Sequence, residues 1–117
     1  MNQRIKDLWA KALRSGTYEQ TPGSLHTIDG FCCLGVRCDL SRKEGNGEWD
    51  TYDGEAFVFV EGSKREWDLL PPSVQQWANL ASACPIVNLE EGIKALSELN
   101  DAGATFEQIA TLIEEQL

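Results

Sequence analysis

The residues from Phe31 to Leu40 constrain the fold more than any other stretch of this chain. They form its most apolar ten-residue window, and three of the four cysteines lie within it. Read as a helix, the window carries apolar side chains on two faces, and a helix of that kind is usually buried. Asp29 can accept hydrogen bonds from the first free amides of such a helix. We therefore predict a central buried helix near residues 31–41, on which the other elements pack.

Hydrophobic spacing, proline placement and capping residues predict four further helices, over residues 3–14, 72–82, 89–101 and 106–116. Asn88 with Glu91 forms a capping box for the third of these, and Thr105 with Gln108 forms one for the fourth. The side chains expected to meet in one buried core are Trp9, Leu13, Leu34, Val36, Trp77, Leu96 and Ile109.

The clearest strand signal is a hairpin around Asp53-Gly54, a dipeptide typical of tight turns. Residues 49–52 precede this turn, and residues 56–60 follow it with alternating side chains. Another short strand is predicted at residues 25–28. Together these elements predict an α+β fold in one domain, residues 1–117, with about five helices around a small antiparallel sheet.

The formal net charge is −9, and it is concentrated in the second half of the chain. Residues 66–117 contain nine acidic groups and one basic group, Lys94, whereas residues 1–65 are nearly balanced. An acidic surface repels duplex nucleic acid, and residues 104–117 lack the positive charge of a DNA-reading helix. The same surface can bind a basic protein or simply keep the chain soluble.

Targeting signals are missing from the sequence as it stands. No run approaches the roughly 20 apolar residues of a membrane span, and the first residues lack the apolar centre of a signal peptide. We therefore expect a cytoplasmic protein that does not bind membranes.

The cysteines Cys32, Cys33, Cys38 and Cys84 have neither the spacing of a disulfide framework nor the Cys-x-x-Cys pair of a zinc site. Side chains of adjacent helical residues point about 100° apart, so Cys32 and Cys33 cannot easily bind one ion. We expect reduced thiols, no metal and no cofactor. The alternative is an enzyme with Cys32 or Cys33 as nucleophile and His26 as base. Apolar neighbours oppose it, because burial raises a thiol pKa.

Polar groups of several kinds are concentrated just after the first predicted helix. Arginine offers a planar fork for carboxylate or phosphate, tyrosine a stacking face, and glutamine both a donor and an acceptor. Together they suit a small anionic, nucleotide-like ligand, and a second arginine reaches it if the central helix is oriented favourably. The alternative is an ordinary helix end with a glycine stop. The candidate ligand-binding residues are Arg14, Ser15, Gly16, Tyr18, Gln20 and Arg37.

Two motifs resemble those of a recurring family of small bacteriophage proteins: Leu13-Arg14-Ser15-Gly16-x-Tyr18-x-Gln20 and Phe31-Cys32-Cys33-Leu34-Gly35-Val36. The resemblance extends over nearly the whole chain through Trp9, Leu70-Pro71, Trp77, Leu99-Asn100-Asp101 and Ile109-Ala110. It implies a phage origin, and so a location in the host cell cytoplasm, and a shared fold rather than a particular activity.

A small phage accessory protein without a catalytic constellation most often acts by binding. By analogy we expect a homo-oligomer, most simply a dimer, that sequesters a small anionic ligand such as a host signalling nucleotide. The polar cluster around Arg14 and the nearly balanced charge of residues 1–65 favour this counter-defence function. The acidic C-terminal half favours the alternative, which is direct inhibition of a host defence protein.

Overall fold

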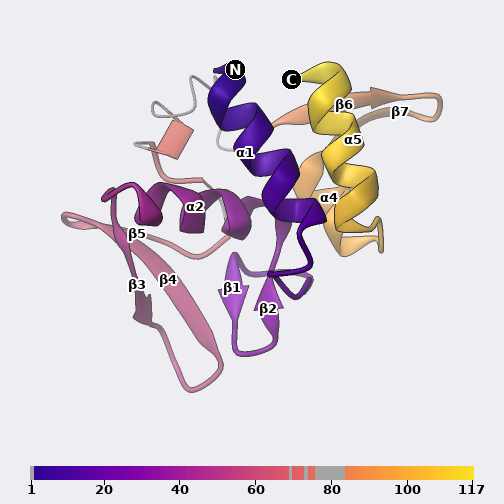
Figure 1. Cartoon of the computed structure of the whole chain (residues 1–117). Helices are drawn as coiled ribbons and strands as arrows, with labels where there is room; N and C mark the ends of the chain where they lie inside the picture. Colours follow the sequence, from indigo (N-terminus) through magenta and orange to yellow (C-terminus); the bar gives the residue numbers. More distant parts are fainter. Residues whose placement is uncertain (1, 69, 73, 76–83) are drawn as a thin grey trace.

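The computed structural model describes residues 2–68, 70–72, 74–75 and 84–117. These residues have the predicted α+β fold, in which strands β1 to β4 extend from one end of a helical cluster (Figure 1). The described helices are α1 (Gln3–Arg14), α2 (Cys33–Lys43), α4 (Leu96–Asp101) and α5 (Phe106–Gln116). The described strands are β1 (His26–Thr27), β2 (Gly30–Phe31), β3 (Glu48–Thr51), β4 (Ala56–Glu61), β5 (Lys64–Glu66), β6 (Ile86–Leu89) and β7 (Gly92–Ala95).

The larger sheet has the strand order β2-β1-β4-β3, β5 also pairs with β4, and all these pairings are antiparallel. The predicted turn at Asp53-Gly54 joins β3 to β4. Asp53 Oδ1 fixes this turn by accepting hydrogen bonds from the amides of Glu55 and Ala56, at 2.7 and 2.9 Å. The strand predicted at residues 25–28 is confirmed in its centre as β1.

The central helix of the fold is α2, which begins two residues later than the predicted start at Phe31. Gly30 and Phe31 pair with β1, so their backbone is extended rather than helical. The N-cap is therefore Cys32 and not Asp29, and the Cys32 thiol accepts a hydrogen bond from the Gly35 amide at 3.4 Å. Every residue from Cys33 to Asp39 is buried, which confirms the prediction of a buried central helix.

Close contacts fix α2 against its neighbours. The buried indole of Trp9, on α1, donates a hydrogen bond from Nε1 to the carbonyl oxygen of Cys33 at 3.0 Å. A Cβ at Gly35 would lie 1.8 Å from the carbonyl oxygen of Leu25, so only glycine permits this approach of α2 to the segment before β1. The predicted core is confirmed for Trp9, Leu13, Leu34, Val36, Leu96 and Ile109, while Trp77 lies outside the described residues.

The region before α4 differs most from prediction. Residues 86–95 form the antiparallel hairpin β6–β7, and only the last part of the predicted helix 89–101 is helical. Asn88 is therefore not a helix cap. Its backbone amide and carbonyl instead pair with the side-chain amide of Gln116, at 2.7 and 2.8 Å. Val87 is fully buried, so burial of the strand face outweighs the local capping signal.

The other C-terminal helix agrees with prediction. Thr105 and Gln108 form the predicted capping box at the start of α5, and α5 lies alongside α1 (Figure 1). The helix predicted over residues 72–82 falls largely outside the described residues, so the described helices number four rather than about five. None of these four is both long and apolar enough to span a membrane.

Candidate functional site

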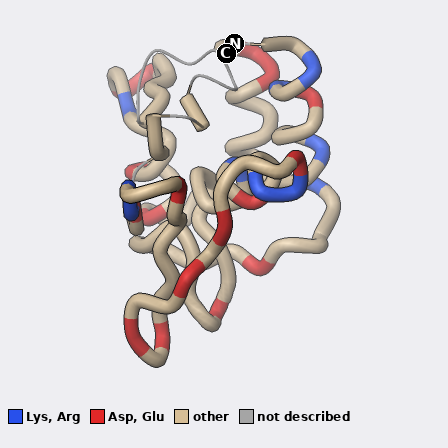
Figure 2. The backbone as a smooth tube through the Cα atoms, turned by 90° about the vertical axis from the view of Figure 1, so that its left-hand side faces the viewer, with Lys and Arg blue, Asp and Glu red and all other residues tan. Residues whose placement is uncertain are grey.

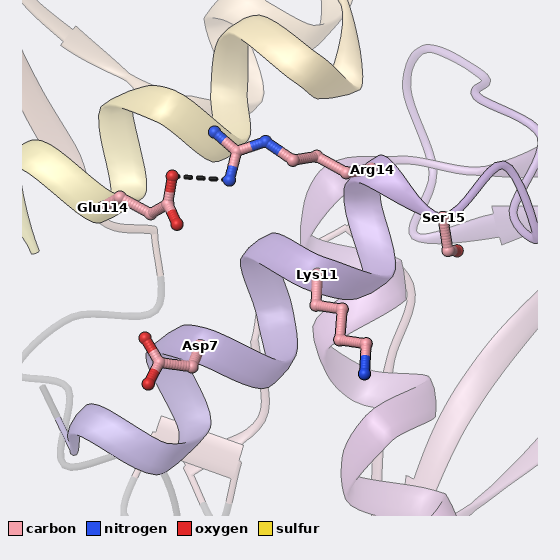
Figure 3. A pocket seen from close by; sticks show the side chains of 5 residues that line it. All are labelled: Asp7, Lys11, Arg14, Ser15 and Glu114. Carbon is pink, nitrogen blue, oxygen red and sulfur yellow. Dashed lines mark ion pairs between the residues drawn. The ribbon is translucent and has the colours of Figure 1, made fainter.

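Arg14, the first predicted anion partner, binds carboxylates of α5. Its guanidinium forms ion pairs with Glu107 at 3.1 Å and with Glu114 at 2.5 Å, and it donates a hydrogen bond to Thr111 Oγ1 at 3.0 Å. Figure 3 shows the Arg14 side chain turned towards Glu114, whereas Lys11 points away from both. The geometry therefore gives Arg14 a role in joining α1 to α5.

Ser15 and Gly16 form the end of α1. Ser15 Oγ donates a hydrogen bond to the Ala12 carbonyl oxygen at 2.7 Å and accepts one from the Thr17 amide at 3.1 Å. Gly16 has a positive φ of 77°, the conformation in which glycine commonly ends helices. This part of the predicted site thus has the geometry of an ordinary helix terminus, with the Ser15 side chain still exposed.

The side-chain amide of the exposed Gln20 bonds to other residues of the chain, and Arg37 is buried. Gln20 Nε2 donates hydrogen bonds to Asn100 Oδ1 at 2.9 Å and to the Ala104 carbonyl oxygen at 2.7 Å. Arg37 is fully buried, its guanidinium carbon lies 5.3 Å from the ring centroid of Trp9, and burial lowers its pKa to about 9. Neither residue shares a described hollow with Tyr18 or Ser15.

Tyr18 is held in place by Asp39, a buried residue of α2. The Tyr18 hydroxyl donates a hydrogen bond to Asp39 Oδ2 at 2.6 Å. Asp39 Oδ1 also accepts from Arg42 Nε at 2.7 Å and from Trp49 Nε1 at 3.0 Å. Burial acts to raise the pKa of Asp39, but these three donors outweigh it and lower the pKa. Burial, with the bond to Asp39, raises the pKa of Tyr18.

A surface hollow of about 250 Å³ lies beside Tyr18, between α1 and α2, and we call it the α1–α2 hollow. Its apolar lining consists of Leu8, Ala12 and Leu40, and its polar lining consists of Lys11, Ser15, Thr17, Tyr18 and Lys43. No carboxylate is among these residues, although the protein carries a net charge of −9. A hollow with two lysines, two hydroxyls and one tyrosine has the chemistry to bind an anion that also carries a ring.

The two lysines differ in their surroundings. Within the described residues Lys11 forms no ion pair. Lys43 Nζ lies 3.9 Å from Asp39 Oδ2 and 5.3 Å from the ring centroid of Tyr18. Asp39 has stronger donors in Arg42, Tyr18 and Trp49, so Lys43 keeps most of its capacity to pair with an external anion.

A second hollow, of about 490 Å³, adjoins the first and shares Lys11 and Ser15 with it. Its other lining residues are Asp7, Arg14 and Glu114, which are drawn in Figure 3. The two carboxylates oppose its positive charge. An anion therefore meets a more favourable field on the Tyr18 side of Lys11 than on the Arg14 side.

Three residues that line this hollow were not predicted from the sequence: Lys11, Thr17 and Lys43. Lys11 has a local signal, because it precedes Ser15 by four residues and so shares one side of the helix end with it. Lys43 has none. It reaches the hollow only because α2 packs beside α1.

The surroundings of the cysteines and of His26 do not favour the alternative of a catalytic pair. Burial raises the pKa of Cys32 to about 11 and that of Cys33 well above its usual value. His26 Nδ1 lies 2.8 Å from the carbonyl oxygen of Gly30, and the imidazole stacks on Phe31 with centroids 3.8 Å apart. The four cysteines, all within the described residues, form no disulfide bond, and the same residues contain no cluster of three or more side chains suited to a metal ion.

The fold and the hollow define a small α+β protein that carries a local basic hollow on an acidic chain. The chain belongs to a family described as a domain of unknown function, DUF8296, whose model matches residues 1–117. No curated protein and no solved structure matches the chain. Function must therefore be argued from the site itself.

Proposed function

We propose that this protein binds a small anionic, nucleotide-like ligand in the α1–α2 hollow and sequesters it without catalysis. The observation that carries the proposal is the charge of the lining: Lys11 and Lys43 face a hollow without carboxylates on a protein of net charge −9. An acidic protein repels anions on the whole, so a hollow lined by two lysines and no carboxylate is a favourable place for one. The proposed ligand-binding residues therefore differ from those predicted from the sequence. Arg14, Gln20 and Arg37 are assigned to the support of the structure instead.

Each lining group has a role in this proposal. Lys11 and Lys43 pair with the phosphate or carboxylate, and the hydroxyls of Ser15 and Thr17 supply hydrogen bonds. Tyr18 and the apolar lining contact the ring of the ligand. The Tyr18 ring needs no reorganisation on binding, since its hydroxyl is already bonded to Asp39.

The volume of the hollow limits the ligand. At about 250 Å³ it lies just below the roughly 300–1,000 Å³ of ordinary small-molecule sites. It suits one phosphate with one attached ring system. The adjoining hollow can take a further part of a larger ligand, such as a second phosphate near Lys11.

The resemblance to small phage proteins supports a counter-defence role for such binding. A phage protein that removes a host signalling nucleotide needs affinity but no chemistry at the ligand. The alternative function, direct inhibition of a host defence protein, requires an acidic contact surface and does not use this basic hollow.

Isothermal titration calorimetry against AMP, ADP-ribose, a cyclic dinucleotide and inorganic phosphate tests the proposal. We expect at least one nucleotide to bind, and Lys11→Ala and Lys43→Ala each to weaken binding by about tenfold, the lower range for a charge-assisted hydrogen bond. Lys94→Ala, on β7, is the matched control and should leave affinity unchanged. Absence of binding by all four probes, or equal affinity of both hollow variants and wild type, would contradict the proposal.

A further inference from the structure

Two exposed aromatic side chains stack on each other away from the core. Tyr52 and Trp67 have ring centroids 5.3 Å apart and an interplanar angle of 29°, yet they remain 59% and 47% exposed. Their backbones are fixed, since the Trp67 carbonyl accepts from the Leu25 amide at 2.7 Å and the Tyr52 amide donates to the Ala56 carbonyl at 2.9 Å. Rigid, exposed aromatic groups of this kind are typical anchors of protein interfaces.

Trp67 lines two surface hollows, of about 390 and 360 Å³. The first hollow also contains Tyr52, and its charged lining residues are Asp29, Asp53 and Glu55. Those of the second are Asp68 and Asp101. No lysine or arginine lines either hollow, so the aromatic pair lies in an acidic surround.

This negative charge is not neutralised within the described residues. None of the five carboxylates forms an ion pair there. Residues 44–61, which include β3 and β4, contain six acidic residues and no lysine or arginine, although Glu44 and Asp50 form ion pairs with Arg4 and Arg65. Figure 2 shows the result: the loops at the lower end of the molecule carry acidic residues and no basic ones. Such a surface attracts a cationic partner over several ångströms.

We propose that this Tyr52–Trp67 surface docks an arginine-bearing segment of another protein. A guanidinium group can stack on the Trp67 or Tyr52 ring while its N–H groups pair with the flanking carboxylates. Arginine suits the surface better than lysine, because its planar and weakly hydrated head group stacks on aromatic rings. A segment fits better than a small cation, because the two hollows that share Trp67 offer room for successive residues.

The docking surface is independent of the α1–α2 hollow, with which it shares no lining residue. The two have opposite charge. The protein thus combines a basic hollow for a small anion with an acidic aromatic surface for a basic partner, and either can fail a test without affecting the other.

Fluorescence anisotropy with a labelled arginine–glycine repeat peptide tests the docking proposal. We expect wild type to bind it more tightly than the matching lysine–glycine peptide. Trp67→Ala should weaken binding of the arginine peptide about tenfold, roughly the effect of losing a partly desolvated cation–π contact. Tyr52→Ala should also weaken it and serves as the second variant if Trp67→Ala does not fold, as judged by circular dichroism.

Charge variants separate this surface from the overall acidity of the protein. Glu55→Gln with Asp68→Asn should weaken binding and reduce its salt dependence. The matched control, Glu90→Gln with Glu91→Gln at the β6–β7 turn, makes the same change in net charge and should leave affinity within about twofold, because charges far from a contact are screened. Failure of wild type to bind, equal affinity for both peptides, undiminished binding by folded Trp67→Ala and Tyr52→Ala, or an equal loss in the control would overturn the proposal.

Discussion

The side-chain oxygen of Asn100 accepts a hydrogen bond from the backbone amide of Cys33 at 3.2 Å, across 67 residues of chain. The same oxygen accepts from Gln20 Nε2 at 2.9 Å, and Asn100 Nδ2 donates to the Thr21 carbonyl oxygen at 2.9 Å. One buried side chain on α4 therefore connects the start of the central helix to the segment that follows α1. A buried amide with all these partners stabilises a unique arrangement of the three segments.

We expect Asn100→Ala to destabilise the protein by about 1–3 kcal/mol, because it leaves the Cys33 amide and the Thr21 carbonyl buried without their partner. Chemical denaturation followed by circular dichroism measures this change. Asn88→Ala is the control, since the exposed Asn88 uses its backbone rather than its side chain in the bonds with Gln116. Equal stability of Asn100→Ala and wild type would contradict the assignment.

The Tyr18–Asp39 pair predicts how stability depends on pH. The folded pKa of Asp39 lies below its ordinary value of 3.8, so its contribution is present above pH 3.8 and is lost as pH falls through the folded pKa. The folded pKa of Tyr18 lies above its ordinary value of 10.0, so its contribution is present below pH 10.0 and is lost as pH rises through the folded pKa.

Thermal unfolding measured across this range should therefore show loss of stability at both extremes. Asp39→Asn should reduce the dependence of stability on pH in acid, and Tyr18→Phe should reduce it in alkali. Asp50→Asn is the control for the first variant, because Asp50 forms an exposed ion pair with Arg65. If Asp39→Asn loses stability at low pH in the same way as wild type, the group responsible for that loss is not Asp39.

The buried thiols should be slow to react. Cys32, Cys33 and Cys38 are buried, and burial raises the pKa of each, so little thiolate forms at neutral pH. We expect mass spectrometry after brief iodoacetamide treatment to find these three unmodified in the native protein and modified after unfolding in denaturant. Rapid alkylation of native Cys32 would contradict this and revive the Cys–His enzyme alternative.

Self-association remains a prediction from the sequence. Ile86 and Ile93 are 57% and 63% exposed and lie on one face of the β6–β7 hairpin, so they offer apolar area for a symmetric contact. Light scattering should detect a species of twice the 13.0 kDa chain mass, and Ile93→Glu should reduce it. A single species of one chain mass at tens of micromolar would contradict a dimer.

Elements with strong local signals could be predicted from the sequence. The α1 helix, the Asp53-Gly54 turn and the Thr105 cap of α5 agree because each signal acts between residues only a few positions apart. The two-faced apolar pattern of residues 31–40 likewise indicated burial of α2. Its start could not be placed, because Phe31 is extended only through its pairing with β1.

The tertiary structure decided the rest. Asn88 and Glu91 have the spacing of a capping box, but the burial of Val87 and the bonds from Gln116 place this segment in a hairpin.

The candidate site also differs from the predicted one because of contacts between residues far apart in the sequence. Arg14 binds Glu107, 93 residues away, and Gln20 binds Asn100, 80 residues away, so neither partner is visible in the local motif. Lys11 and Lys43 meet at one hollow only through the packing of α1 against α2. Sequence determines which chemical groups are present and which local turns and helices they favour. Packing determines which of those groups bond to internal partners and which remain exposed to a ligand.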